Sequence, residues 1–256
     1  MPVKRVISVD VHSQDTRLTA PAAEWIGDEP VRNRVLSLMR PRDLAAIRPH
    51  LKKERLREHR VLFDVERQVG HVYFPDSSII SLASVGNRTA AVGTVGVEGM
   101  VGLGVFLGEA VSLVRATVRA PGVAYRMRAP TFRRLVRELA GFRQAMLSCT
   151  RSFIADLNRR EDCGSAHLVE QRCARWLLVT SDRVGDATFP LTLEFLALMV
   201  GVRLGGVTVG VRALQDRGLV QYHHGHVEIL DRRGLERATC ECYRSSLAAD
   251  SPLAVS

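Results

Sequence analysis

The sequence predicts an α+β protein in which an N-terminal antiparallel β-roll is joined by a long helix to a C-terminal domain of helices and a hairpin. Three patterns support this. Apolar segments rich in Val, Ile, Phe and Tyr recur about every eight to twelve residues between 61 and 129, as in rolls and barrels. A helical apolar repeat then runs from Phe142 to about Asp162. Two helical segments around Gly201 precede alternating segments around Gly225, which predict a hairpin.

Length and composition allow two domains, each with its own core. The chain has 256 residues, of which 46% are hydrophobic. It has no run of about 18 apolar residues and no signal-peptide pattern at its start, so we expect a soluble, cytoplasmic protein that does not enter a membrane. Five cysteines are scattered and never spaced as Cys-x-x-Cys, which predicts neither a disulfide framework nor a zinc knuckle. We therefore expect no metal and no cofactor.

The net charge of +9 is unevenly distributed. Residues 1–29 carry −2 (three basic, five acidic), residues 30–164 carry +11 (23 basic, 12 acidic), and residues 165–256 are neutral (ten of each). Much of the excess lies in PHLKKERLREHR, residues 49–60, which we interpret as a solvated helical face. Basicity therefore favours nucleic-acid binding only weakly.

The N-terminal half divides into a tail, two short helices and the roll. We predict that residues 1–29 form a flexible tail, and that residues 30–164 form the roll with the long helix. NRVLSLMRPRDLAAIRPHL predicts two short helices around Pro41. The predicted β segments are VLFDVERQ, HVYFPDSSIISLASV, TAAVGTV, EGMVGLGVFLG, SLVRATVRAP and VAYRMRA.

A helix at PTFRRLVREL precedes the long one, whose apolar residues recur at steps of three and four. They are Phe142, Met146, Cys149, Phe153 and Leu157, with Asp156 as an alternative last position. This seam either packs on the roll or contacts a second copy of the chain, and periodicity alone does not separate the two. Gly164-Ser165 interrupts the pattern and predicts a hinge before the second domain, residues 165–256.

The second domain is expected to contain a helix-turn-helix and a hairpin, which together make a winged helix. HLVEQRCARWLLVTSDRVG predicts its first helix, and the expected core positions there are Leu168, Cys173, Trp176, Leu177 and Val179. Thr192 is the expected N-cap of the next helix and an expected DNA contact. Glu194 lies in the first turn of that helix, which should end near Met199. A terminal helix is expected from about Asp231 to Leu247.

The second helix of the helix-turn-helix is expected to bury an apolar stripe and to face DNA with its other side. The buried stripe comprises Val202, Val207, Val211 and Leu214, and the outward residues are Arg203, Leu204, Gly205, Thr208, Val209 and Arg212. Glycines at 205, 206 and 210 each cost the helix up to about 1 kcal/mol. We expect backbone and phosphate contacts to dominate, with base discrimination by Arg203 and Thr208.

The hairpin tip carries His223, His224 and His226 around Gly225. Three interpretations remain open: a wing tip that contacts phosphate through His223 and His224, a metal site, and a solvated turn.

Taken in order, several motifs resemble the CRP/FNR superfamily of bacterial transcription regulators over about Asn33 to Tyr243. They are NRVLSLM, HVYFPDSSIISL, GVEGMVGLGVFLG, HLVEQRCARWLL, LTLEFLALMVGVR, ALQDRGLVQY and LDRRGLERATCECY. The resemblance implies a cyclic-nucleotide-binding-like β-roll, a dimerisation helix at the Phe142 seam, and a winged helix that enters the major groove. It implies promoter DNA, a second copy of the chain and RNA polymerase as partners.

The chain departs from that family's pattern at three places. Where cyclic-nucleotide-binding members carry a glutamate after a glycine and an Arg-Ser pair, this chain has Gly102 with Leu103, and Val114 with Arg115, so cyclic AMP lacks a charged anchor. These four residues mark the expected pocket for a small-molecule effector of unknown identity. No cysteine precedes Cys149, which argues against an N-terminal iron–sulfur cluster. Leu204 and Gly205 stand where strong DNA readers place Arg and Glu.

Two other classes of function compete with this one. A cupin enzyme would need clustered histidines in the roll, but the β segments hold only His71, so we expect no enzyme. A dimeric sensor or protein-partner module whose winged helix no longer reads specific DNA is favoured by the zero net charge of residues 165–256. The intact cap, turn and apolar stripe favour the DNA-binding regulator.

Overall fold

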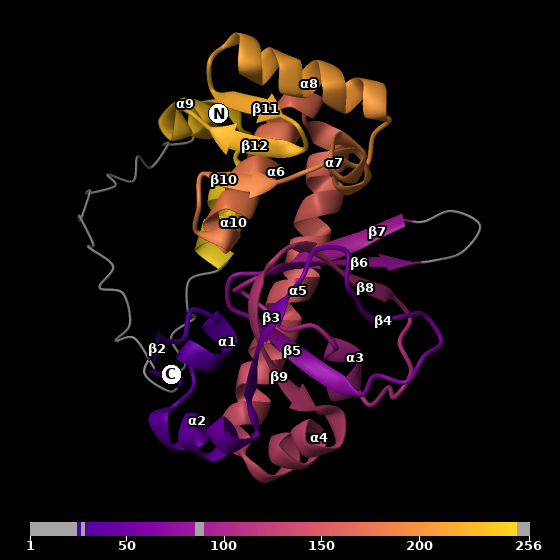
Figure 1. Ribbon diagram of the computed structural model, residues 1–256, viewed down its shortest axis with the longest axis vertical. Coiled ribbons are helices and arrows are strands. Elements are labelled where there is room, and N and C mark those ends of the chain that lie inside the picture. Colours follow the sequence, from indigo (N-terminus) through magenta and orange to yellow (C-terminus); the bar gives the residue numbers. More distant parts are fainter. Residues whose placement is uncertain (1–24, 27–28, 85–89, 250–256) are drawn as a thin grey trace, which may run out of the picture.

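The structure is a computed structural model, and it describes residues 25–26, 29–84 and 90–249. Most of the predicted tail lies outside these residues. Figure 1 shows the roll and the C-terminal domain at the two ends of one long helix, α5.

The N-terminal domain consists of short strands framed by helices. In chain order its elements are β1 (Trp25–Ile26), β2 (Glu29–Pro30), α1 (Arg34–Ser37), α2 (Pro41–Ile47), the 3-10 helix η1 (Arg48–His50), β3 (Lys52–Leu56), β4 (Val61–Phe63), β5 (His71–Pro75), β6 (Ile79–Ser84), β7 (Ala90–Val95), α3 (Leu103–Phe106), β8 (Arg115–Ala120), β9 (Gly122–Arg128) and α4 (Ala129–Glu138). Pro41 begins α2, where its missing N–H costs no hydrogen bond.

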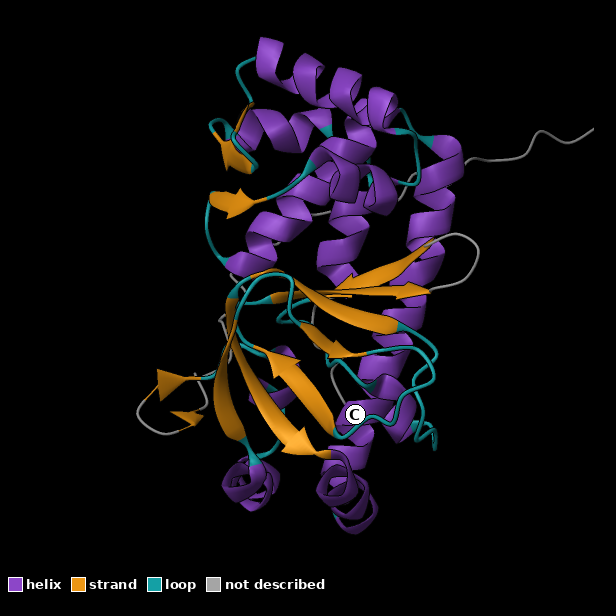
Figure 2. Cartoon of the chain, turned by 45° about the vertical axis from the view of Figure 1, so that its right-hand side comes forward, coloured by secondary structure: helices purple, strands orange, loops and turns teal. Residues whose placement is uncertain are grey.

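Two antiparallel sheets enclose one core, which confirms the predicted roll (Figure 2). Their strand orders are β3-β9-β5 and β4-β8-β6-β7. Alternate residues of each strand point inward, so Phe74 and Tyr125 of one sheet join Ile80 and Val118 of the other in a single apolar cluster.

The prediction of a solvated helical face at residues 49–60 is wrong, because strand β3 lies within this segment. β3 pairs with β9 and buries Leu56, while Glu54 forms ion pairs with Arg60 (2.9 Å) and Arg126 (3.3 Å). An edge strand tolerates such charges, and they protect it from pairing with other chains. Charge pattern alone cannot tell that edge from a helix.

The predicted strand at EGMVGLGVFLG is also wrong, because most of it leaves the sheet. Only Val101 makes a bridge, to Tyr73. Gly102 then takes a left-handed conformation (φ 98°) and α3 begins at Leu103. Glycine adopts this conformation without a Cβ penalty, which lets the strand end there.

The long helix α5 (Ala140–Ala166) extends further than predicted and faces differently. It passes through Gly164 without a break, so the expected interruption at Gly164-Ser165 is wrong and the helix ends before His167. Its packing offsets the cost of one glycine. Phe142 and Met146 are fully buried, and Cys149 is nearly so, in the core of the roll. Those three residues therefore cannot meet a second copy.

The C-terminal domain has its own core and a three-stranded sheet. Its elements are α6 (Val169–Val184), β10 (Thr188–Pro190), α7 (Leu193–Val200), α8 (Leu204–Asp216), β11 (Val220–His223), β12 (His226–Ile229), α9 (Arg232–Ala238) and α10 (Cys242–Ala249). β11 and β12 form the predicted hairpin, and β10 pairs with β12 as a third strand. Leu168 was expected to be a core residue of the first helix, and this prediction is wrong: Leu168 precedes α6 and is 72% exposed.

The predicted terminal helix is divided into α9 and α10 by residues 239–241. Asp231 caps α9 by accepting a hydrogen bond from the Gly234 N–H (2.9 Å). The break turns Cys240 and Cys242 toward the end of α5.

Among the described residues, no single helix is long and apolar enough to cross a membrane. Taken together, the bent helix pair α7 and α8 is long and apolar enough for a membrane span, but by length and composition alone.

Candidate nucleic-acid interface

The turn between α7 and α8 forms as the sequence predicts. Thr192 caps α7, its hydroxyl oxygen accepting a hydrogen bond from the Phe195 N–H (3.2 Å). Gly201 ends α7 in a left-handed conformation (φ 71°). The helices are bent by 104° relative to each other, within the range of helix-turn-helix motifs.

One face of α8 anchors it in the domain core. Val207, Val211 and Leu214 are buried, and Val202 packs at the margin. A Cβ at Gly210 would lie 3.4 Å from backbone atoms of Glu170 in α6. Gly210 thus allows a close approach between α8 and α6, which explains one of the three glycines by packing.

The opposite face of α8 is exposed, as predicted. It presents Arg203, Leu204, Gly205, Thr208, Val209 and Arg212. A Cβ at Gly205 would meet nothing within 4 Å, so this glycine keeps a bare backbone at the helix start. The Thr208 hydroxyl donates to the Leu204 carbonyl (3.0 Å). Backbone N–H groups at a helix N-terminus favour anions such as phosphate.

The arginines of this face are available to a ligand. Neither Arg203 nor Arg212 forms an ion pair within the part of the chain that the structure describes. By contrast, Arg217 just after α8 pairs with Glu170 (2.6 Å). Two exposed arginines on one helix face suit a phosphate backbone.

The wing is a tight hairpin whose tip is exposed. His224 (φ 46°) and Gly225 (φ 77°) both have positive φ, as a two-residue hairpin turn requires. The rings of His223 and His224 lie with centroids 3.9 Å apart, and both side chains are exposed. Among the described residues, these histidines do not belong to a group whose ligand atoms converge on one point.

Comparison with known proteins assigns this domain. A model of the Crp-like helix-turn-helix domain matches residues 171–238. The C-terminal domain is a Crp-like helix-turn-helix domain. No curated protein matches the chain in sequence.

Solved structures match over both domains. FixK2 from Bradyrhizobium japonicum has a TM-score of 0.60 at 9% identity, covering 74% of this chain and 98% of its own. The c-di-GMP-responsive global regulator CLP from Xanthomonas campestris has a TM-score of 0.59 at 17% identity (74% and 99%). A CRP-family transcriptional regulator from Thermus thermophilus, TTHB099, has a TM-score of 0.61 at 15% identity (72% and 95%). The chain therefore has the CRP/FNR fold, and residues 171–238 form a Crp-like helix-turn-helix domain.

The four predicted effector residues are not brought together around one cavity. Leu103 lines a cavity between the roll, α5 and α6, but Val114 and Arg115 do not. Arg115 instead donates two hydrogen bonds to Asp64 (2.9 and 2.8 Å). Hydrogen bonding from Arg115 holds the pKa of Asp64 below its usual value. Arg115 is therefore engaged away from the cavity.

A polar cluster beside this cavity, which the sequence analysis missed, ties the Crp-like domain to the roll. Arg183 of α6 donates to the Thr94 hydroxyl (2.6 Å) and pairs with Glu98 (2.8 Å), and Arg160 of α5 pairs with Asp156 (2.8 Å). Burial alone would raise the pKa of Asp156, but Arg160 and other arginines outweigh it and lower that pKa. These residues come from distant segments, so no local spacing indicates them.

Proposed function

We propose that the protein acts as a cytoplasmic homodimer that inserts α8 of each subunit into the major groove of promoter DNA, next to RNA polymerase. The observation that supports this most directly is the exposed face of α8, where Arg203 and Arg212 have no ion-pair partner among the described residues. A second α8 in a symmetric dimer would meet the next half-site of a palindromic operator.

The dimer contact that we propose is the outer face of α5. Leu147 and Ile154 are 49% and 53% exposed and lie seven residues apart, on one face of the helix. Leu157, from the predicted seam, is half-buried and follows within one turn. Phe153 packs against the roll instead. Covering such a face removes apolar surface from water.

The dimer is tested by Ile154→Glu, with Leu113→Glu as a control because Leu113 is exposed on the roll. Light scattering after size-exclusion chromatography should give a dimer for the control and a monomer for Ile154→Glu. Dimers in both variants would rule out this face.

DNA binding is tested by fluorescence anisotropy on a duplex selected from a random pool, across a range of salt concentrations. A regulator that contacts phosphates should lose affinity steeply as salt rises, and should keep its selected site in the presence of random competitor. If random DNA displaces the selected duplex as effectively as the selected sequence itself does, the protein does not recognise a specific DNA sequence.

A protein-partner module is the second candidate. It is supported by the exposed Leu204 and Val209 on α8 and by the zero net charge of residues 165–256. Absence of DNA binding even at low salt would favour it.

We also propose that the roll does not hold cyclic AMP in the usual way. Leu103 supplies no carboxylate, and Arg115 is already engaged by Asp64. Titration calorimetry with cyclic AMP should show no saturable binding.

A further inference from the structure

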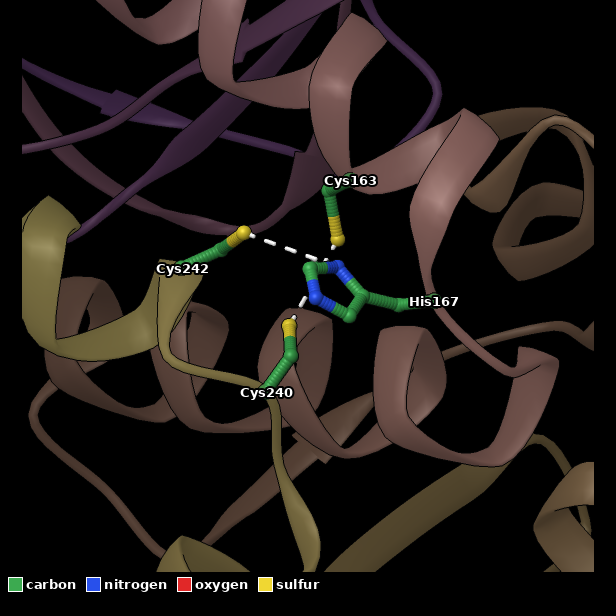
Figure 3. A group of neighbouring side chains, drawn as sticks. All are labelled: Cys163, His167, Cys240 and Cys242. Atoms are coloured by element: carbon green, nitrogen blue, oxygen red, sulfur yellow. Dashed lines mark hydrogen bonds between the residues drawn. The ribbon is translucent and has the colours of Figure 1, made fainter.

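Four metal-ligand side chains meet where α5 ends and the C-terminal domain closes onto it. Cys163 lies in the last turn of α5 and His167 directly follows this helix. Cys240 lies in the break between α9 and α10, and Cys242 is the first residue of α10. Figure 3 shows all four side chains pointing toward one another. Their ligand atoms lie within 4.8 Å of one another, and within the described residues this is the one such group.

The distances within this Cys/His cluster are those of ligands around a single ion. Cys163 Sγ lies 3.6 Å from Cys240 Sγ, and Cys242 Sγ lies 3.7 Å from His167 Nδ1. A tetrahedral ion with metal–sulfur bonds of about 2.3 Å and metal–nitrogen bonds of about 2.0 Å places sulfurs about 3.8 Å apart and sulfur and nitrogen about 3.5 Å apart. An iron–sulfur cluster spreads its thiolates over several irons, so its four ligands lie further apart.

Neighbouring groups prepare the cluster for a cation. The Glu241 carboxylate lies 3.1 Å from His167 Nε2, so it can accept the Nε2–H and leave Nδ1 facing the sulfurs. Metal-bound histidines are commonly oriented by a carboxylate in this way. Cys163 and Cys240 are 1% and 3% exposed, whereas Cys242 is half-buried and gives an ion a route of entry.

We propose that Cys163, His167, Cys240 and Cys242 bind one Zn²⁺ ion. Three sulfur ligands and one imidazole nitrogen form a closed Cys₃His set, typical of structural zinc. On binding, each of the three thiols loses its proton to solvent and its sulfur forms a bond to zinc. The complex then carries one negative charge, which the buried Arg175 close by offsets.

The ion fastens the Crp-like domain to the long helix. The chain crosses between the two at His167 and Leu168, and it comes back to the end of α5 at Cys240 and Cys242. Zinc would close this loop and hold α6 to α10 in one orientation on α5. This expectation rests on the proposed function: the bound metal should strengthen DNA binding, because it would fix the orientation of α8 in each subunit and this orientation sets the spacing of the two half-sites.

The first test is the metal content of full-length protein purified under reducing conditions, measured by inductively coupled plasma mass spectrometry. We expect one zinc per chain in the wild type and in Cys149→Ala and Cys173→Ala, since those cysteines are buried elsewhere. We expect none in Cys242→Ser, which changes the most accessible thiol. Glu241→Gln should keep zinc with an affinity about 10–100-fold lower.

The second test replaces zinc by Co²⁺ in the full-length protein. The wild type should show the intense visible bands of tetrahedral cobalt and a thiolate charge-transfer band, and Cys242→Ser should lose both. Circular dichroism should give the same spectrum for Cys242→Ser and for wild type treated with a chelator, because both should have the same metal-free fold. Matching spectra show that Cys242→Ser lacks the cobalt bands because it has lost a ligand and not because it has unfolded.

Several outcomes would overturn the site. One is absence of zinc from the reduced wild type together with failure to take it up on titration. Another is equal zinc uptake by Cys242→Ser and Cys149→Ala. A third is a Cys163–Cys240 disulfide, found by peptide mapping, in protein whose reduced form binds no zinc. Metal content is measured without DNA, so a zinc protein that binds no DNA would refute the proposed function and leave the site intact.

Discussion

The exposed face of α8 and the junction between the two domains contrast in how their residues come together. The face of α8 belongs to one run of 13 residues, in which a helical period separates the buried side from the exposed side. The junction comprises the Cys/His cluster and the polar cluster around Asp156, and their members come from segments up to 89 residues apart. A contiguous surface can be recognised from spacing, whereas a convergent one depends on the fold.

The largest expected effect tests whether packing holds α8 in place. Leu214→Ala removes a fully buried side chain from the domain core and should lower the free energy of unfolding by about 2–5 kcal/mol. Val209→Ala, on the exposed face of the same helix, should change it by less than about 0.5 kcal/mol. Urea denaturation measures both. Equal effects would mean that α8 does not pack as described.

The next effect separates binding from folding on α8. Arg203→Ala should weaken specific DNA binding by about 1–3 kcal/mol through loss of a base contact, and Arg212→Ala should lower the salt slope by about one counterion. Arg57→Ala removes the same charge from the exposed surface of the roll and serves as control. If all three variants bind alike in anisotropy titrations, α8 is not the reader.

A pH effect tests the junction. The pKa of Asp156 is lowered in the folded protein, so its carboxylate contributes stability above the unfolded pKa and loses it as pH falls through the folded one. Asp156→Asn should therefore be less stable than the wild type at pH 7, and the difference should shrink as pH falls below 3.8 and vanish once pH is below the lowered pKa of the folded protein. Urea unfolding at several pH values measures this. A difference independent of pH would exclude the carboxylate as its source.

The smallest effect concerns the open glycine of α8. Gly205→Ala should raise the free energy of unfolding by about 0.5–1 kcal/mol, because nothing lies within 4 Å of the new Cβ. DNA affinity should fall if this backbone approaches a phosphate as we propose. Gly234→Ala is the contrasting variant, because its Cβ would overlap Leu219 and Asp231 and destabilise the domain.

The same contrast explains which predictions failed. Phe142, Met146 and Cys149 have a true helical period, but both a core and a dimer contact produce that period, and here the roll buries them. β3 was missed because its outward charges resemble a solvated helix, and only pairing with β9 distinguishes the two. The cysteine spacing gave no sign of the Cys/His cluster, because two of its members lie at the end of α5 and the other two follow about 75 residues later in the chain.

By itself, the sequence determined that a β-roll is followed by a long helix and a helix-turn-helix, and it determined the cap at Thr192, the turn at Gly201 and the two faces of α8. These depend on residues within a few positions of one another, where backbone hydrogen bonding and side-chain period act directly. Only the tertiary structure decided which face of α5 is free, where Arg115 points, and that Cys163, His167, Cys240 and Cys242 meet. Those outcomes depend on how separate segments pack, which no local pattern encodes.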